Sequence, residues 1–294
     1  MSAEGAPDAG AVSRVGVVGC GLMGSGIAEV SARAGLDVIV LEMSEQFVAA
    51  GKAKVEASLG NAVKRGKLSE DEYESVFGRI TFTAEAEALA DRELVVEAVP
   101  EIEEMKVELF RTLDKVVSAP DAVLASNTSS IPIMKLGMAT NRPEQVVGIH
   151  FFNPVTVLPL VELVPSLLTA PAVLDQARAF ASSQLGKTVI QSQDRAGFVV
   201  NALLIPYILA AIRMFESGFA TAEDIDAGMV KGCAHPMGPL ALADLIGLDT
   251  VMAVAVSMYE EFKEPLYASP PMLLRMVDAG LLGRKTKRGF FQYP

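Results

Sequence analysis

The stretch that decides the fold is RVGVVGCGLMGSGIAEV, from Arg14 to Val30. A short apolar segment leads into three glycines at G-x-G-x-x-G spacing, and a small-residue helix pattern follows. Glycine allows a tight turn, close approach of the backbone to a pyrophosphate, and close packing of helix on strand. The backbone N–H groups at the start of the helix then face the phosphates. The stretch therefore predicts a strand–turn–helix unit that contacts a dinucleotide through Gly19, Gly21, Leu22, Met23 and Gly24.

A second apolar segment, DVIVLE, strengthens this interpretation against the alternative of a merely structural tight turn. It ends on Glu42, eighteen residues after Gly24, where an acid that binds the ribose is expected. The carboxylate accepts hydrogen bonds from ribose hydroxyls and repels a 2′-phosphate. No arginine follows in MSEQ to bind such a phosphate. The predicted cofactor is therefore NAD(H) rather than NADP(H).

Short β-branched segments alternate with helical patterns as far as about residue 192. The predicted strands are RVGVVG, DVIVLE, RITFT, ELVVEAV, AVLASN, VVGIHF, LVELV and KTVIQS. This alternation predicts an α/β fold of the Rossmann-like, doubly wound type, with a mostly parallel sheet and helices on both faces. Ligands of such sheets bind at the carboxyl ends of the strands, where Glu42, Glu97, Ser126 and His150 are expected.

The strand pattern disappears after DRAG, Asp194 to Gly197, and the remainder is predicted to be an all-helical domain. The expected organisation is a flexible tail over residues 1–13, an NAD-binding domain over 14–192, and a substrate and dimerisation domain over 193–294. The apolar stretches LLIPYILAAI and VMAVAVSM exceed what a small domain readily buries, which predicts a homodimer through this half. The alternative is that these helices bury one another.

Composition excludes several function classes. The chain has 294 residues, is 51% hydrophobic, and carries 36 acidic against 25 basic residues, for a net charge of −11. This charge disfavours binding to nucleic acid or to an anionic membrane. Two cysteines are too few for a disulfide framework, and the start of the chain lacks the apolar segment of a signal peptide, so a cytoplasmic location is expected. The most apolar segment is interrupted by Asn201 and Pro206, which predicts a buried helix and no membrane span.

Only two histidines are present, so the search for a general acid or base is short. His150 follows the predicted strand VVGI, and Glu162 is a lone carboxylate inside the apolar segment PLVELV. A buried carboxylate is costly unless a partner neutralises it, and an imidazole is such a partner. The pair fixes the tautomer of the ring and stabilises its protonated form, as a proton carrier requires. Neither histidine stands at metal-ligand spacing, so no metal is expected.

Two further polar residues are candidates for contact with a substrate. The segment SNTSS, Ser126 to Ser130, ends a predicted strand and precedes a helix. It predicts a hydroxyl N-cap for that helix, and Ser129 additionally lies on the ligand side of the sheet. Asn201 lies among apolar residues on the first helix of the second domain, where a buried amide needs a partner such as a substrate carbonyl.

These motifs together resemble the ordered motifs of the 3-hydroxyacyl-CoA dehydrogenase family, and most closely those of its stand-alone bacterial members. The matching motifs are GCGLMGSGIA, LVVEAV, ASNTSSIPI, GIHFFNPV, LVEL, GFVVNALLIPY, HPMGPL, DLIGLDT and GRKTKRGFF. The resemblance implies NAD-dependent, reversible oxidation of a (3S)-3-hydroxyacyl-CoA, here 3-hydroxybutyryl-CoA, to a 3-ketoacyl-CoA such as acetoacetyl-CoA. It also implies a set of site residues. These are Ser129, His150, Glu162 and Asn201 in the active site, Glu101, Lys106, Asn153 and Lys285 at the dinucleotide, and Ser58 at coenzyme A.

Four positions depart from the family pattern, and other functions remain as alternatives. Glu42 replaces a common Asp, Cys20 a small residue, Thr156 a Pro, and Pro159 a Lys. None of these changes removes a catalytic group, and the last two bear on acyl-chain or carrier preference. The alternatives are a free hydroxy-acid dehydrogenase of the gulonate type, an enzyme for acyl-carrier-protein thioesters, and a non-catalytic dinucleotide-binding protein. Lys106 has its own alternative as a solvated helix lysine.

Overall fold

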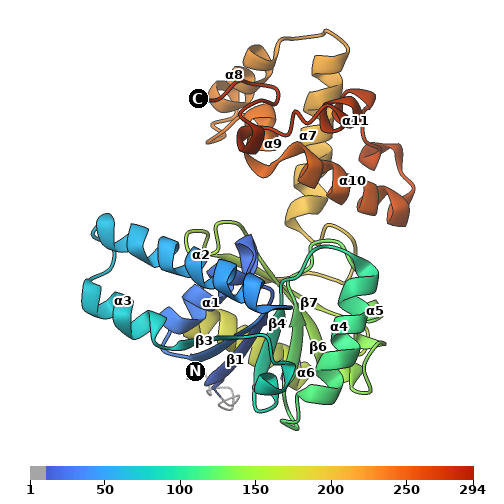
Figure 1. Cartoon of the computed structure of the whole chain (residues 1–294). Helices are drawn as coiled ribbons and strands as arrows, with labels where there is room; N and C mark the ends of the chain where they lie inside the picture. The colour runs from blue at the N-terminus through green and yellow to red at the C-terminus, as the bar shows by residue number, and fades with distance from the viewer. Residues whose placement is uncertain (1–10) are drawn as a thin grey trace, which may run out of the picture. The chain divides into compact units, whose positions relative to one another are not determined.

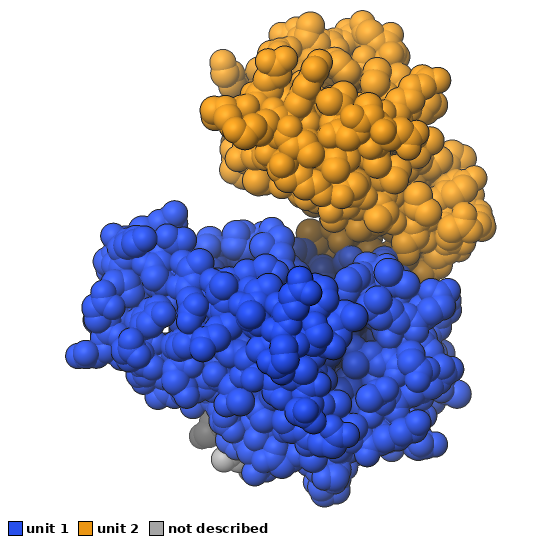
Figure 2. Space-filling model, in the orientation of Figure 1, with its two compact units in different colours: residues 1–194 blue, residues 195–294 orange. Residues whose placement is uncertain are grey.

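The computed structural model describes residues 11–294, which fall into two compact units, one ending at Asp194 and the other beginning at Arg195 (Figures 1 and 2). Residues 1–10 of the predicted tail lie outside the described residues. The described residues of that predicted tail contact the first unit. Val12 is buried, and the backbone N–H and hydroxyl of Ser13 donate to Glu93.

The first unit contains one eight-stranded sheet in the order β3-β2-β1-β4-β5-β6-β7-β8. The strands are β1 (Arg14–Val18), β2 (Asp37–Leu41), β3 (Ile80–Thr83), β4 (Leu94–Glu97), β5 (Val123–Ser126), β6 (Val146–Phe151), β7 (Leu160–Pro165) and β8 (Thr188–Gln191). Neighbouring strands are parallel except β6 and β7, which are antiparallel. The predicted Rossmann-like, mostly parallel fold is confirmed.

Helices surround this sheet. They are α1 (Leu22–Arg33), α2 (Glu45–Lys64), α3 (Glu70–Phe77), α4 (Glu103–Val116), α5 (Ile133–Gly137) and α6 (Pro171–Ala179), and α6 continues into a short π-helical segment, Phe180–Gln184. Short 3₁₀ turns lie at Ala86–Leu89 and Pro143–Gln145. The helix α3 begins with a capping box formed by Ser69 and Glu72.

The central strands are covered on both faces. Every residue of β4, β5 and β6 is buried, which explains why these segments appear as continuous apolar stretches rather than alternating ones. Polar side chains inside such strands are therefore exceptional. Three of them are Glu97, Ser126 and His150, and a fourth buried polar residue, Glu162, lies in β7 opposite His150.

The second unit is helical and has its own core, built from residues of this unit such as Ile208, Leu240 and Met258. Its helices are α7 (Val200–Glu216), α8 (Ala222–Gly232), α9 (Pro239–Ile246), α10 (Leu248–Phe262) and α11 (Pro271–Asp278), with 3₁₀ turns at Pro265–Tyr267 and Arg284–Thr286. Pro206 lies inside α7. Among residues 11–294 no single helix is long and apolar enough to cross a membrane, although α9 and α10, bent by 96° at their junction, pass that test as a pair.

Candidate active site

The glycine turn connects β1 to α1, and each of its three glycines meets a different constraint. Gly19 has a φ of +88°, which side chains rarely adopt. A Cβ at Gly24 would lie 1.8 Å from the carbonyl oxygen of Gly19, so the helix packs directly on the turn. A Cβ at Gly21, by contrast, would meet nothing within 4 Å. The chain itself therefore leaves the space beside Gly21 open, as a site for an approaching pyrophosphate requires.

Glu42 follows β2 directly and holds this turn in place. Its Oε1 accepts a hydrogen bond from the backbone N–H of Cys20 at 2.5 Å, and Lys54 of α2 donates to the carbonyl oxygen of Cys20 at 3.3 Å. Leu22, at the first position of α1, is 70% exposed. Open space beside Gly21, a partly exposed acid at the end of β2 and exposed apolar surface at Leu22 together fit a dinucleotide.

His150 and Glu162 form the predicted pair. Nδ1 of His150 lies 2.8 Å from Oε2 of Glu162. The imidazole is 6% exposed and the carboxylate is fully buried. Because an ionised carboxylate can only accept, Nδ1 carries the proton of this hydrogen bond, which assigns the tautomer and leaves Nε2 as the basic nitrogen.

The sheet register explains why the two side chains meet. β6 and β7 are antiparallel, and His150 is the direct partner of Glu162 across the ladder. Directly opposed residues of antiparallel strands point to the same face with their Cβ atoms about 5 Å apart. The ring of Phe152 contacts the imidazole edge-on, with centroids 4.6 Å apart. The geometry of the pair therefore depends on the backbone ladder.

The SNTSS turn follows β5, and its contacts run to Glu101. Oε1 of Glu101 accepts from the hydroxyl of Thr128, from the backbone N–H of Ser129 at 3.0 Å, and from both the N–H and the hydroxyl of Ser130. Ser129 is partly exposed. The neighbouring Asn127 accepts from the backbone N–H of Phe151, which links this turn to the end of β6.

The predicted N-cap within SNTSS is wrong. The N-cap residue of α5 is Pro132, which supplies no side-chain acceptor. The carboxylate of Asp194 instead accepts from the N–H groups of Ile133 and Met134, at 2.7 and 2.8 Å. An acid 61 residues further along the chain therefore satisfies the start of α5, and the hydroxyls of Thr128 and Ser130 bind Glu101 instead.

The ammonium of Lys106 lies between two carboxylates. Its Nζ is 2.7 Å from Oε1 of Glu97 and 3.1 Å from Oε2 of Glu101, and the residue is 1% exposed. The alternative of a solvated helix lysine is therefore wrong. Glu97 also accepts from the hydroxyl of Ser126 at 2.6 Å and from the N–H of Val99 at 2.7 Å.

The two carboxylates differ in their pKa because they differ in exposure. Burial raises the pKa of Glu97 above its ordinary value, although Lys106 and the hydroxyl of Ser126 act in the opposite direction. Burial acts in the same sense on Glu101, but there Lys106 and the hydroxyl of Thr128 outweigh it, so the pKa of Glu101 is lowered. On acidification Glu97 is thus the first of the two carboxylates to bind a proton.

The other predicted site residues are distributed over both units. Ser58 lies half-buried on α2, and Asn153 is exposed just beyond β6. In the second unit, Asn201 is the second residue of α7 and is partly buried, and Lys285 forms an ion pair with Asp249 at 2.5 Å. The second histidine, His235, lies 3.1 Å from the hydroxyl of Tyr207.

The sequence predicts Glu97 at the carboxyl ends of the strands, where ligands bind, but predicts no role for it. The signal was present, because LVVEAV carries a lone carboxylate at the end of an apolar strand, just as PLVELV does. The same argument that predicts a partner for Glu162 predicts one for Glu97. The identity of that partner was not accessible, because Lys106 reaches Glu97 only through the packing of α4 against the sheet.

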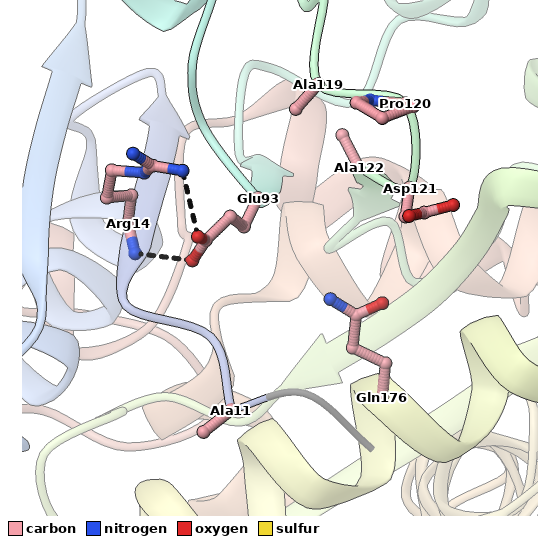
Figure 3. Close-up of a pocket in the computed structure, with 8 residues that line it drawn as sticks. All are labelled: Ala11, Arg14, Glu93, Ala119, Pro120, Asp121, Ala122 and Gln176. Atoms are coloured by element: carbon pink, nitrogen blue, oxygen red, sulfur yellow. Dashed lines mark hydrogen bonds and ion pairs between the residues drawn. The ribbon is translucent and has the colours of Figure 1, made fainter.

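A cavity of about 300 Å³ lies at the amino ends of the strands, opposite the ends that carry the glycine turn (Figure 3). Its lining includes Arg14, Glu93 and Ala122, which stand at the amino ends of β1, β4 and β5. Arg14 and Glu93 point toward each other and form an ion pair at 2.9 Å (Figure 3). Because ligands of parallel sheets bind at the carboxyl ends, this cavity is not the predicted dinucleotide site.

Comparisons with known proteins agree over both units. Residues 14–195 match the 3-hydroxyacyl-CoA dehydrogenase NAD binding domain, and residues 197–293 match the 3-hydroxyacyl-CoA dehydrogenase C-terminal domain. A 3-hydroxybutyryl-CoA dehydrogenase of Mycobacterium tuberculosis is 59% identical over 96% of this chain and 99% of its own. Among solved structures, FadB2 of M. tuberculosis superposes with a TM-score of 0.96 at 58% identity, covering 97% of this chain and 100% of that one. The (S)-3-hydroxybutyryl-CoA dehydrogenase of Ralstonia eutropha gives 0.91 at 42% identity, with coverage of 97% and 100%. The chain belongs to the 3-hydroxyacyl-CoA dehydrogenase family.

Proposed function

We propose that this protein catalyses the reversible, NAD(H)-dependent oxidation of (3S)-3-hydroxybutyryl-CoA to acetoacetyl-CoA. The observation that carries the proposal is the buried pair of His150 and Glu162, 2.8 Å apart near the carboxyl edge of a dinucleotide-binding sheet. The relatives named above support the substrate, since two of them are 3-hydroxybutyryl-CoA dehydrogenases that align with almost the whole chain.

The chemistry assigns each proton a place. NAD⁺, when bound, supplies a hydride acceptor for the hydrogen on C3 of the substrate. His150 takes the hydroxyl proton on Nε2, because Nδ1 is engaged by Glu162. Glu162 then stabilises the positive charge that the imidazole acquires. In the direction of reduction, His150 returns the same proton to the ketone oxygen.

Other residues bind and orient. Ser129 donates a hydrogen bond to the reacting oxygen, and Asn201, carried by the second unit, holds the thioester carbonyl. The pyrophosphate contacts the turn formed by Gly19, Gly21, Leu22, Met23 and Gly24, and Glu42 binds the ribose. The remaining proposed contacts are those of Glu101, Asn153 and Lys285 with the dinucleotide and that of Ser58 with coenzyme A.

A substrate panel tests the function. The rate of NADH loss is measured with acetoacetyl-CoA, acetoacetate, acetoacetyl-acyl-carrier protein and longer 3-ketoacyl-CoAs. The expected result is highest kcat/KM with acetoacetyl-CoA and little activity with the free acid. Activity confined to acetoacetate would support a free hydroxy-acid dehydrogenase and overturn the proposal. NADPH replaces NADH in a parallel series, in which Glu42 predicts a strong preference for NADH.

We further propose that the protein is a cytoplasmic homodimer that associates through the second unit. That unit exposes large apolar side chains, among them Leu203 at 74% and Phe219 at 79%. Exposed apolar side chains of this size favour burial in an interface. Sedimentation analysis is expected to give a dimer for the wild type and a lighter species for the double variant Leu203→Glu, Phe219→Glu. A monomeric wild type would contradict the proposal.

A further inference from the structure

The region beneath Ser129 contains a closed circuit of hydrogen bonds that the proposed chemistry does not use. Glu97 accepts from the hydroxyl of Ser126 at 2.6 Å, and the Ser126 oxygen accepts from the backbone N–H of Thr128 at 3.1 Å. Thr128 in turn donates its hydroxyl to Glu101. Lys106 closes the circuit by contacting both carboxylates, at 2.7 and 3.1 Å.

Each carboxylate holds a different end of the turn that carries Ser129. Glu97 holds the beginning through Ser126. Glu101 holds the end through the backbone N–H groups of Ser129 and Ser130, at 3.0 and 3.1 Å. The Ser126–Ser130 turn is thus hydrogen-bonded to an acid at each end. The position of the Ser129 backbone therefore depends on the distance between the carboxylates of Glu97 and Glu101.

Two carboxylates this close to one another repel unless a cation lies between them. Lys106 is the basic side chain that contacts both, and it is 1% exposed, so little water replaces it in neutralising them. Glu97 is fully buried as well. Loss of the ammonium would leave the buried carboxylate of Glu97 facing the partly exposed carboxylate of Glu101 with no cation between them. The two acids would then separate, or Glu97 would bind a proton.

We propose that Lys106 is a positioning residue for the reaction, which holds Glu97 and Glu101 together so that the Ser126–Ser130 turn presents Ser129 to the reacting oxygen. The inference rests on the proposed function, because the role of Ser129 is part of it. It assigns Lys106 an action through Ser129, in place of one that depends on contact with the dinucleotide.

The test is a double-mutant cycle between Lys106→Met and Ser129→Ala, measured with NADH and acetoacetyl-CoA. Displacement of a catalytic group by about 1 Å can lower the rate about 10²-fold. Lys106→Met is therefore expected to lower kcat about 10²-fold. The KM for NADH is expected to change less than about threefold. Because Lys106 acts through Ser129, the same substitution in the Ser129→Ala protein is expected to lower kcat by less than about threefold more. Lys115→Met, an exposed lysine on the same helix, is the matched control, with kcat expected to remain at the wild-type value.

A second variant separates positioning from loss of folding. Glu97→Gln combined with Lys106→Met restores the net charge of −1 that Glu97, Glu101 and Lys106 carry together, and it is expected to recover at least about tenfold of the lost kcat. If Lys106→Met alone does not fold, the double variant Glu97→Gln, Lys106→Met replaces it in the double-mutant cycle. The loss of kcat that remains in this double variant is then expected to disappear when it is introduced into the Ser129→Ala protein. Two results would overturn the proposal. One is an effect of Lys106→Met confined to the KM for NADH. The other is a drop in kcat by the same factor in the wild-type and the Ser129→Ala proteins. An inactive wild type would instead refute the proposed function.

Discussion

At the scale of single residues, the imidazole of His150 is the group on which the proposed chemistry depends. Glu162 engages Nδ1, and the proposed proton transfer therefore uses Nε2. His150→Gln removes the proton carrier and is expected to lower turnover by about 10²- to 10⁴-fold, while NADH binding changes little. His235→Gln is the control, because that ring contacts Tyr207 in the second unit. Steady-state rates and NADH fluorescence titration provide the measurements, and near-normal turnover of His150→Gln would remove His150 from this role.

Cys20 lies within the glycine turn, yet it is expected to be chemically inert. Burial, with a smaller contribution from Glu42, raises the pKa of its thiol to about 12. Almost no thiolate is therefore present at neutral pH. Cys233 is exposed and serves as the internal control. In the native protein iodoacetamide is expected to modify Cys233, with Cys20 modified only after unfolding, as peptide mass spectrometry can show. Equal labelling of both cysteines in the native state would refute this expectation.

At the scale of elements, the sequence predicted the strands well because each is a compact apolar segment between turn residues. The capping box of α3 is predictable from sequence in the same way, since Ser69 and Glu72 lie three residues apart and every partner is local. The failures all involve distant partners. The start of α5 is satisfied by Asp194 rather than by the adjacent hydroxyls. Lys106 is buried because α4 places its ammonium against Glu97 at the end of β4. The residue pattern of α4 alone does not predict that contact.

The capping box of α3 makes stability depend on pH. The backbone N–H and the hydroxyl of Ser69 donate to Glu72, and these hydrogen bonds lower the pKa of Glu72 in the folded state. A lowered folded-state pKa adds stability above the unfolded-state value, and that stability disappears as the pH falls through the folded-state pKa. Glu72→Gln is therefore expected to unfold at lower urea concentration than the wild type near pH 7. The difference should shrink as the pH falls below the unfolded-state pKa of about 4.3 and vanish below the lowered folded-state pKa. Glu74→Gln, on the same helix and outside the box, should show no such trend. A difference that persists unchanged in acid would contradict this account.

At the scale of the whole molecule, each unit has a hydrophobic core of its own. The core of the first unit includes Val17, Val96 and Ile149, and that of the second includes Ile208, Leu240 and Met258. A fragment of residues 1–194 is therefore expected to fold and to bind NADH, because it contains the glycine turn and Glu42. The same fragment is expected to lack turnover, because Asn201 is absent from it. Circular dichroism and NADH fluorescence test the first expectation and an acetoacetyl-CoA assay the second. An unfolded fragment would show that the first core depends on the second unit.

The antiparallel pairing of β6 with β7 also distinguishes residues whose positions the ladder fixes from residues that can be exchanged without disturbing it. His150 and Glu162 are brought together by ladder register, and residues 152–159 connect the two strands, with Phe152 against the imidazole and Val155 in the core. Exchanges at the exposed positions of that connection leave the register intact, since the buried strands on either side specify it. Thr156 and Pro159, two of the departures from the family pattern, both fall there. Substitutions at these two exposed positions leave the ladder that pairs His150 with Glu162 unchanged, which makes them the first positions to randomise when an altered substrate range is wanted.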